Sequence, residues 1–185
     1  MAQNGLTQHA PDRRKSTAAG DARIVRPHSM NTPQVGKHHI ACEFLSRAIE
    51  LYLRGDSYFS AIHLAGAAEE VLSVIVRELP TQSGAPSQST FDQMKELAVA
   101  LSAPPTAEAA KQTEKWIHER MTDAKNSVKH MRGLKDAGIA FNAEEEARDI
   151  IDRTISTYIQ LANRVALPIV SGIAEFDAER RSRLR

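Results

Sequence analysis

Four polar residues on two expected helices have the side-chain types needed to cleave RNA without a metal. Lys125, Asn126 and His130 fall late in one helix, and Glu70 lies on another. In such a reaction the 2′-hydroxyl of the RNA attacks the adjacent phosphorus. Lys125 is expected to stabilise charge on the phosphoryl oxygens and His130 to act as base or acid. Asn126 and Glu70 are expected to position them, and neither a metal ion nor a cofactor is needed.

The spacing between Lys125 and His130 limits what one copy of the chain can do. On a straight helix, residues five positions apart point about 140° away from each other, so the two side chains do not readily face one phosphate. Two copies of this helix that meet face to face could form a shared cleft. The spacing therefore favours a homodimer if these residues are catalytic.

The preceding helix carries two adjacent glutamates with different expected environments. Glu69 lies at the margin of the apolar stripe, where a carboxylate is partly desolvated unless a Lys, Arg or hydroxyl group reaches it. We expect one of Glu69 and Glu70 to have a specific partner. Gly66 and Ala67 are small enough to let another backbone approach closely. By contrast, Lys125 is expected on a solvent-facing basic flank of its own helix.

Hydrophobic spacing and capping residues predict an all-α, up-and-down bundle of about five helices. Apolar residues recur at helical spacing, whereas no strand-like alternation of useful length is present. Ser, Thr and Asn residues supply the starts of the helices, and Gly and Pro supply most of their ends. The expected helices run over 38–54, 58–79 after a cap at Asp56 or Ser57, 90–103, 107–132 and from 143 onward.

Composition divides the chain into three parts with different charges. Residues 1–36 are polar with a charge of +3, which predicts a disordered basic tail, and 37–174 form the bundle with a charge of −3. Residues 175–185 carry +1 and are expected to be a frayed basic end. A mildly acidic bundle disfavours a protein that coats nucleic acid through a broad phosphate-binding surface.

The remaining composition indicates a protein of the cytoplasm. The chain of 185 residues has one cysteine, Cys42, which excludes an intramolecular disulfide and suits a reducing compartment. No apolar run reaches the roughly 20 residues of a membrane helix, and no secretion signal begins the chain, so no membrane contact is expected. His38 with Cys42, or His39 with Glu43, has the spacing of a helical metal site, but exposed pairs of this kind are usually unliganded.

The segment Lys125-Asn126-Ser127-Val128-Lys129-His130 resembles the motif of the HEPN family. It lies late in an expected helix and follows a helical hairpin that carries Leu64-Ala65-Gly66-Ala67-Ala68-Glu69-Glu70. The family signature is an Arg, commonly followed by a polar residue such as Asn, and then four to six residues to a His. Lys125 stands where the family has Arg, so it offers a point charge in place of a bidentate fork.

This resemblance covers roughly residues 38–167 and implies an all-α homodimer in which two motifs face each other. It also implies RNA or nucleotide binding and metal-independent ribonuclease activity in a toxin–antitoxin or defence system, with an antitoxin as a partner. Family members without the full motif resemble non-catalytic modules. The alternative is therefore a helical dimerisation or adaptor module that binds a partner protein. In a third interpretation, the basic tail tethers an inert bundle to nucleic acid.

Overall fold

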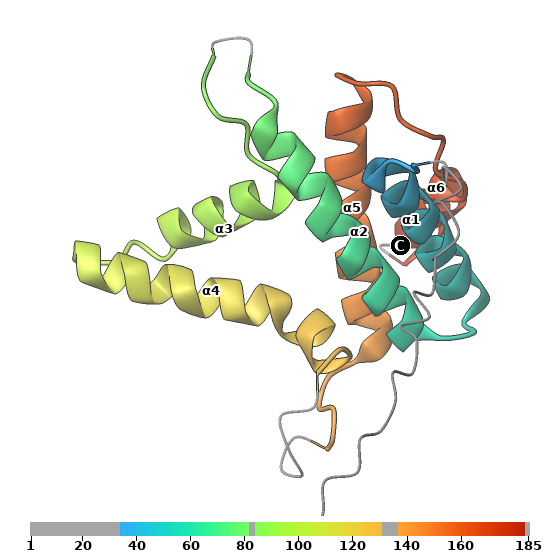
Figure 1. The fold of residues 1–185 in the computed structure, drawn as a ribbon. Helices are drawn as coiled ribbons and strands as arrows, with labels where there is room; N and C mark the ends of the chain where they lie inside the picture. The colour runs from blue at the N-terminus through green and yellow to red at the C-terminus, as the bar shows by residue number, and fades with distance from the viewer. Residues whose placement is uncertain (1–33, 82–83, 131–136, 184–185) are drawn as a thin grey trace, which may run out of the picture. The chain divides into compact units, whose positions relative to one another are not determined.

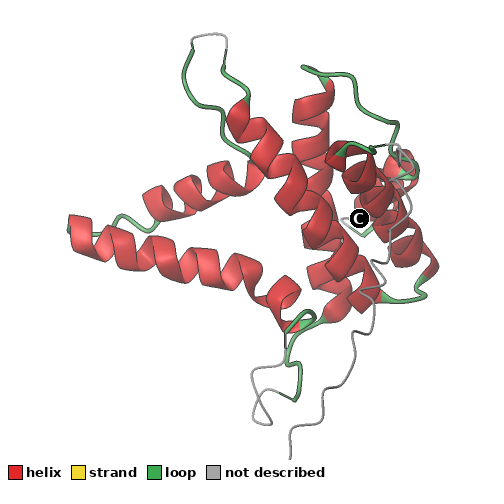
Figure 2. Cartoon of the chain, viewed as in Figure 1, coloured by secondary structure: helices red, strands yellow, loops and turns green. Residues whose placement is uncertain are grey.

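Helices form nearly all of the regular structure in this protein. The computed structural model describes residues 34–81, 84–130 and 137–183 (Figure 1). Within these ranges there are six helices and no strand, as Figure 2 shows. The predicted all-α class is confirmed, with one helix more than expected. The predicted disordered tail lies almost entirely outside the described residues. The helices are α1 Lys37–Arg54, α2 Tyr58–Glu78, α3 Thr90–Leu101, α4 Ala107–Ser127, α5 Ala143–Ala162 and α6 Ile173–Ser182.

Local capping explains where most of these helices begin. The Ser57 side chain accepts a hydrogen bond from the Ser60 amide at the start of α2, so Ser57 is the cap of the two expected candidates, Asp56 and Ser57. Ser89 forms a reciprocal capping box with Asp92 at the start of α3, one residue before the expected Thr90. Asn142 accepts from two amides in the first turn of α5. The first helix ends at Gly55, whose φ of 66° is a left-handed conformation that glycine adopts at no steric cost.

The apolar core lies among α1, α2 and α5, which pack against one another (Figure 1). Leu45 and Ile49 of α1, Leu72 of α2 and Ile150 of α5 are fully buried there. Burying side chains of this size stabilises the fold by about 1.5–3 kcal/mol each. These three helices therefore supply most of the apolar stabilisation of the described chain.

The α3–α4 hairpin is packed more sparsely than the core. Figure 1 shows the two helices extending away from α2, with the turn that joins them at the far end. Phe91 is the only buried residue of α3, and α4 buries Ile117, Thr122, Ala124 and Lys125. The hairpin thus meets the core at its inner end alone.

Two predicted boundaries differ from the structure. The α4 helix ends at Ser127 instead of continuing to 132, so His130 lies in the coil that follows. The segment expected to be a frayed end, 175–185, instead contributes most of α6. Phe176 explains the second difference, because it is fully buried and its ring meets that of Tyr52 edge-on at 5.4 Å. This aromatic contact anchors α6 to α1.

Among the helices of the described residues, α2 alone is long and apolar enough to cross a membrane by length and composition. Its most apolar window has a mean hydropathy of 1.5, and 50% of that window is buried inside the protein. A core helix passes the same test. The hydropathy of α2 is thus accounted for by its packing against α1 and α5.

Candidate functional site

A buried ion-pair cluster joins the α3–α4 hairpin to the core. Glu69 of α2 is its centre, and only 2% of its side chain is exposed. The Arg153 Nε of α5 donates to the Glu69 Oε1 at 2.5 Å, and the Lys125 Nζ of α4 donates to the Glu69 Oε2 at 3.4 Å. Both cations are buried: 7% of the Arg153 side chain and 9% of the Lys125 side chain are exposed. The predicted specific partner of a glutamate on this helix is confirmed, and Glu69 has two.

Glu70 extends this cluster to the surface. Its Oε1 lies 3.3 Å from the Nζ of Lys125 and 3.2 Å from the Nζ of Lys129. Partial burial opposes ionisation of Glu70, but the charges and hydrogen bonds of the two lysines outweigh it and lower the pKa of the carboxyl. Glu70 is therefore ionised near neutral pH. The charge of Lys125 is shared between two carboxylates.

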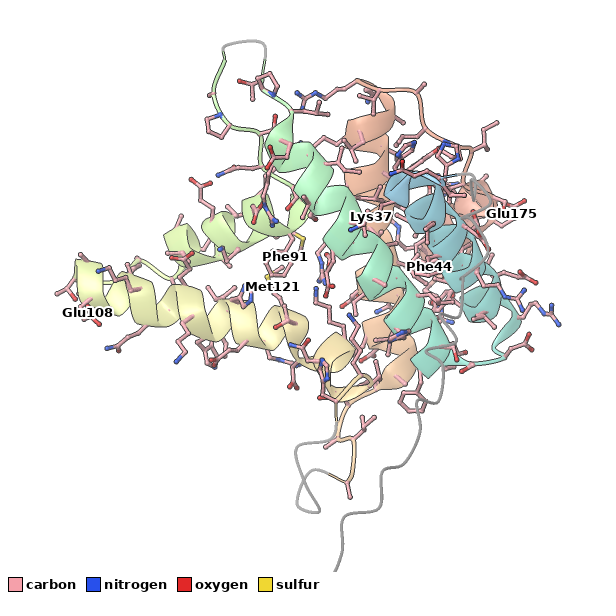
Figure 3. All side chains as sticks on the ribbon, viewed as in Figure 1. Lys37, Phe44, Phe91, Glu108, Met121 and Glu175 are labelled. Atoms are coloured by element: carbon pink, nitrogen blue, oxygen red, sulfur yellow. The ribbon has the colours of Figure 1, made fainter. Side chains whose placement is uncertain are left out.

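Phe91 of α3 adds an aromatic contact to both buried cations. Its ring centroid lies 5.8 Å from the Lys125 Nζ and 5.6 Å from the Arg153 Cζ, within the range of cation–π attraction. Figure 3 labels Phe91 at the inner end of the hairpin, whereas Glu108 marks the far end. Residues of α2, α3 and α5 thus surround Lys125 of α4.

Gly66 allows Lys125 to come this close to α2. A Cβ atom added to Gly66 would lie 3.1 Å from the Lys125 Cβ and 3.3 Å from its Cδ, tighter than ordinary van der Waals contact. The aliphatic part of the lysine therefore packs against the α2 backbone while its ammonium group reaches Glu69. The expectation was a close backbone, whereas the atoms that lie against Gly66 belong to the side chain of Lys125.

A cavity of about 340 Å³ opens beside this cluster between α2, α3 and α4. Lys125 and Arg77 are the cations that line it. Lys125 faces the two glutamates, and the Arg77 guanidinium donates to both carboxylate oxygens of Asp92 at 2.8 and 3.0 Å. Each lining cation is therefore already paired with a carboxylate of the chain. The cavity does not present the uncompensated positive charge that would attract a phosphate.

The structure brings three of the four predicted site residues together. Glu70, Lys125 and Asn126 all line the cavity, but exposed His130 does not. The prediction that Lys125 lies on a solvent-facing flank is wrong, because its stem covers Gly66 and its charge is needed at Glu69. Sequence reasoning missed Arg153, although an arginine between buried Ile150, Ile151 and Ile155 on an amphipathic helix is a signal of an internal ion pair.

The ion pairs of the cluster serve to hold the α3–α4 hairpin against the core. Removing one member of a buried pair leaves an uncompensated charge and typically costs about 3–5 kcal/mol. The cluster connects α4 to α2 and α5, against which α4 otherwise packs sparsely. Within 34–81, 84–130 and 137–183, no group of three or more His, Cys, Asp or Glu side chains is placed to hold a metal ion.

Comparison of the chain with models of protein families, with curated proteins and with solved structures finds no match in any of the three.

Proposed function

We propose that this chain is a non-catalytic helical module that binds a partner protein, with Lys125 as a structural residue. The proposal depends mainly on the position of the Lys125 Nζ, 3.4 Å from Glu69 and 3.3 Å from Glu70. A lysine that stabilises a phosphorane-like transition state must meet the phosphoryl oxygens with its charge available. Here, RNA would first have to displace two carboxylates from a nearly buried ammonium group.

The position of His130 supports the same function. It is exposed in the coil after α4, outside the cavity that Lys125 and Asn126 line. General acid–base catalysis needs the histidine within hydrogen-bond reach of the reacting atoms. One copy of the chain therefore does not place His130 and Lys125 at the same phosphate, and cleavage by these two residues would require a second copy to supply His130.

The α3–α4 hairpin provides the surface for a binding function. Several of its large apolar side chains face solvent, including Leu97, Leu101 and Trp116, of which Leu101 is 77% exposed. Single exposed apolar residues are common on protein surfaces, but a cluster on one projecting element marks an interaction site. These residues are not part of the core, most of which α1, α2 and α5 supply.

Incubation of the purified full chain with labelled, unstructured RNA tests this function. We expect no cleavage above that of the His130→Ala variant, which should fold normally because His130 is exposed outside the helices. Lys125→Met is the second variant, and its circular dichroism spectrum shows whether it remains folded. Cleavage by the wild type that is lost in folded His130→Ala would show that the chain is a ribonuclease and would overturn the proposal.

A further inference from the structure

A groove of about 590 Å³ lies between the α3–α4 hairpin and α5, on a different set of residues from the cavity beside Glu70. Its two walls differ in chemistry. The hairpin wall is largely apolar and includes Met94, Ala98, Trp116 and Met121. Figure 3 labels Met121 toward the inner end of the hairpin, away from Glu108 at the far end.

The wall contributed by α5 is mainly acidic, and Arg153, which also lines it, is paired with buried Glu69. Glu146, Asp149 and Asp152 follow one another at intervals of three residues, which places them on one face of the helix. From Glu146 to Ser156, the last residue of α5 in the groove, the wall runs for about 15 Å, at 1.5 Å per residue. Such a length matches three turns of a bound helix.

We infer that this groove binds an amphipathic helix of a partner protein, one that has apolar residues on one side and Lys or Arg on the other. This inference depends on the proposed binding function and specifies the chemistry of the partner. Apolar side chains of the partner would cover Trp116, which is 65% exposed, and Met94, which is 46% exposed. Its basic residues would face Glu146, Asp149 and Asp152.

The three carboxylates already have arginine neighbours on this chain. The distances are 3.6 Å from Arg120 to Glu146, 3.6 Å from Arg148 to Asp149 and 3.2 Å from Arg180 to Asp152. The side chains of these arginines are exposed to different degrees. Exposed ion pairs of this kind contribute about 0–1 kcal/mol to the free energy of unfolding. A cation of the partner can therefore replace or share them at little cost, in contrast to the buried pair at Glu69.

Glu146 is the partly buried carboxyl of this wall. Burial is the main cause that raises its pKa, and Asp149 and Asp123 add to the rise, whereas Arg120 and Arg153 oppose it. A cation entering this end of the groove would stabilise the ionised carboxylate. The three carboxylates of the wall thus favour a basic partner over an acidic one.

Trp116 provides a direct measurement because it is the only tryptophan of the chain. The probe is a synthetic helix-forming peptide of about 17 residues, without Trp, with Leu at every third or fourth position and Lys or Arg on the opposite face. We expect its addition to the full chain to shift the Trp116 emission to shorter wavelength. A peptide with Glu in place of every Lys and Arg should leave the emission unchanged.

Two variants and a matched control locate the binding site. With a fluorescein-labelled peptide, Asp149→Lys and Trp116→Ser should each weaken binding roughly tenfold, by repulsion and by loss of apolar contact. Both side chains are exposed, so neither substitution is expected to disturb the fold. Glu43→Lys changes the charge equally on α1, outside the groove, and should bind the peptide as the wild type does.

Several results would overturn the inference. They are an absence of any emission shift, equal binding of the Glu-substituted peptide, and equal weakening by Glu43→Lys. Self-association of the chain that Trp116→Ser abolishes, without peptide binding, would assign the groove to a second copy instead. None of these outcomes concerns RNA cleavage, so a failure here is distinct from a failure of the proposed non-catalytic function.

Discussion

The core helices and the α3–α4 hairpin are held in place by different forces. In α1, α2 and α5, apolar side chains such as Leu45, Leu72 and Ile150 are fully buried against one another. The hairpin buries few apolar residues and is joined to α2 and α5 by charges centred on Glu69. Apolar burial is non-directional, whereas an ion pair fixes one geometry. The comparison shows that buried ion pairs can hold a polar helix to the core while its outer surface stays exposed to solvent.

This difference also separates two kinds of charged residue in the hairpin. Lys125 and Asp92 have partners on α2 and hold the hairpin to it. Lys95 and Glu114 lie 2.9 Å apart and join α3 to α4 within the hairpin itself. Substitutions in the first group should loosen the whole hairpin, and those in the second should loosen only its internal packing.

The largest expected effect is that of Glu69→Gln. It leaves Lys125 and Arg153 without the buried carboxylate between them and should lower the free energy of unfolding by about 3–5 kcal/mol. Urea denaturation measures the change. Glu50→Gln is the control, because Glu50 pairs with Arg47 and Arg54 on the exposed face of α1 and its loss should have a much smaller effect on stability. Equal losses of stability in the two variants would show that the buried cluster at Glu69 stabilises the fold no more than a surface ion pair does.

The next largest expected effect is the difference in stability between shortening a leucine of the core and shortening one on the hairpin. Leu72→Ala leaves a cavity among buried residues and should cost about 2–5 kcal/mol. Leu101→Ala on the hairpin removes an exposed side chain and should change the stability by less than about 0.5 kcal/mol. Thermal unfolding of the two variants provides the comparison. A large loss in Leu101→Ala would show that the outer hairpin belongs to the core.

Acid should loosen α3 through Asp92. Burial alone would raise the pKa of its carboxyl, but hydrogen bonds from Arg77 and Ser89 outweigh burial and lower it below the ordinary value of 3.8. A lowered pKa stabilises the fold above 3.8, and that stabilisation is lost as the pH falls through the folded-state value. Asp92→Asn should cost about 1 kcal/mol at neutral pH and lack this acid-dependent loss.

Hydrogen exchange of the α3 amides at neutral and acidic pH measures this effect. The wild type should lose protection in α3 at low pH, whereas Asp92→Asn should have little left to lose. Equal acid-dependent losses in both proteins would show that another group controls the docking of α3.

The smallest expected effect is that of Glu146→Gln in the groove. Burial raises the pKa of Glu146 above 4.5, so ionisation at neutral pH disfavours the folded state. Glu146→Gln should therefore be more stable than the wild type at neutral pH, by no more than about 0.5 kcal/mol. The difference should shrink as the pH falls through the raised folded-state pKa toward 4.5. A less stable variant would show that the pairing with Arg120 outweighs burial.

The sequence predicts the helices of the core well because their signals are local. Ser57, Asn142 and Gly55 mark helix ends through hydrogen bonds and backbone conformations that involve only near neighbours. The need of a glutamate on α2 for a partner could also be predicted, since a carboxylate beside an apolar stripe is costly without one.

The features that the sequence did not predict depend on contacts between distant segments. Nothing in the neighbourhood of Lys125 shows that its stem will pack on Gly66, 59 residues earlier in the chain. Arg153 pairs with Glu69 across 84 residues. The order of α6 likewise depends on the contact of Phe176 with Tyr52 of α1. Periodicity identifies a face of a helix, but it does not identify what covers that face.

A double-mutant cycle between Glu69 and Lys125 tests most directly whether Lys125 is a structural cation. In the Glu69→Gln background, Lys125 keeps only the more exposed Glu70 as a carboxylate partner, so Lys125→Met should cost less stability there than in the wild type. We expect a coupling of at least about 1 kcal/mol from urea denaturation of the four proteins. Additive effects of the two substitutions would show that Glu69 does not hold Lys125, and would contradict its role as a structural cation.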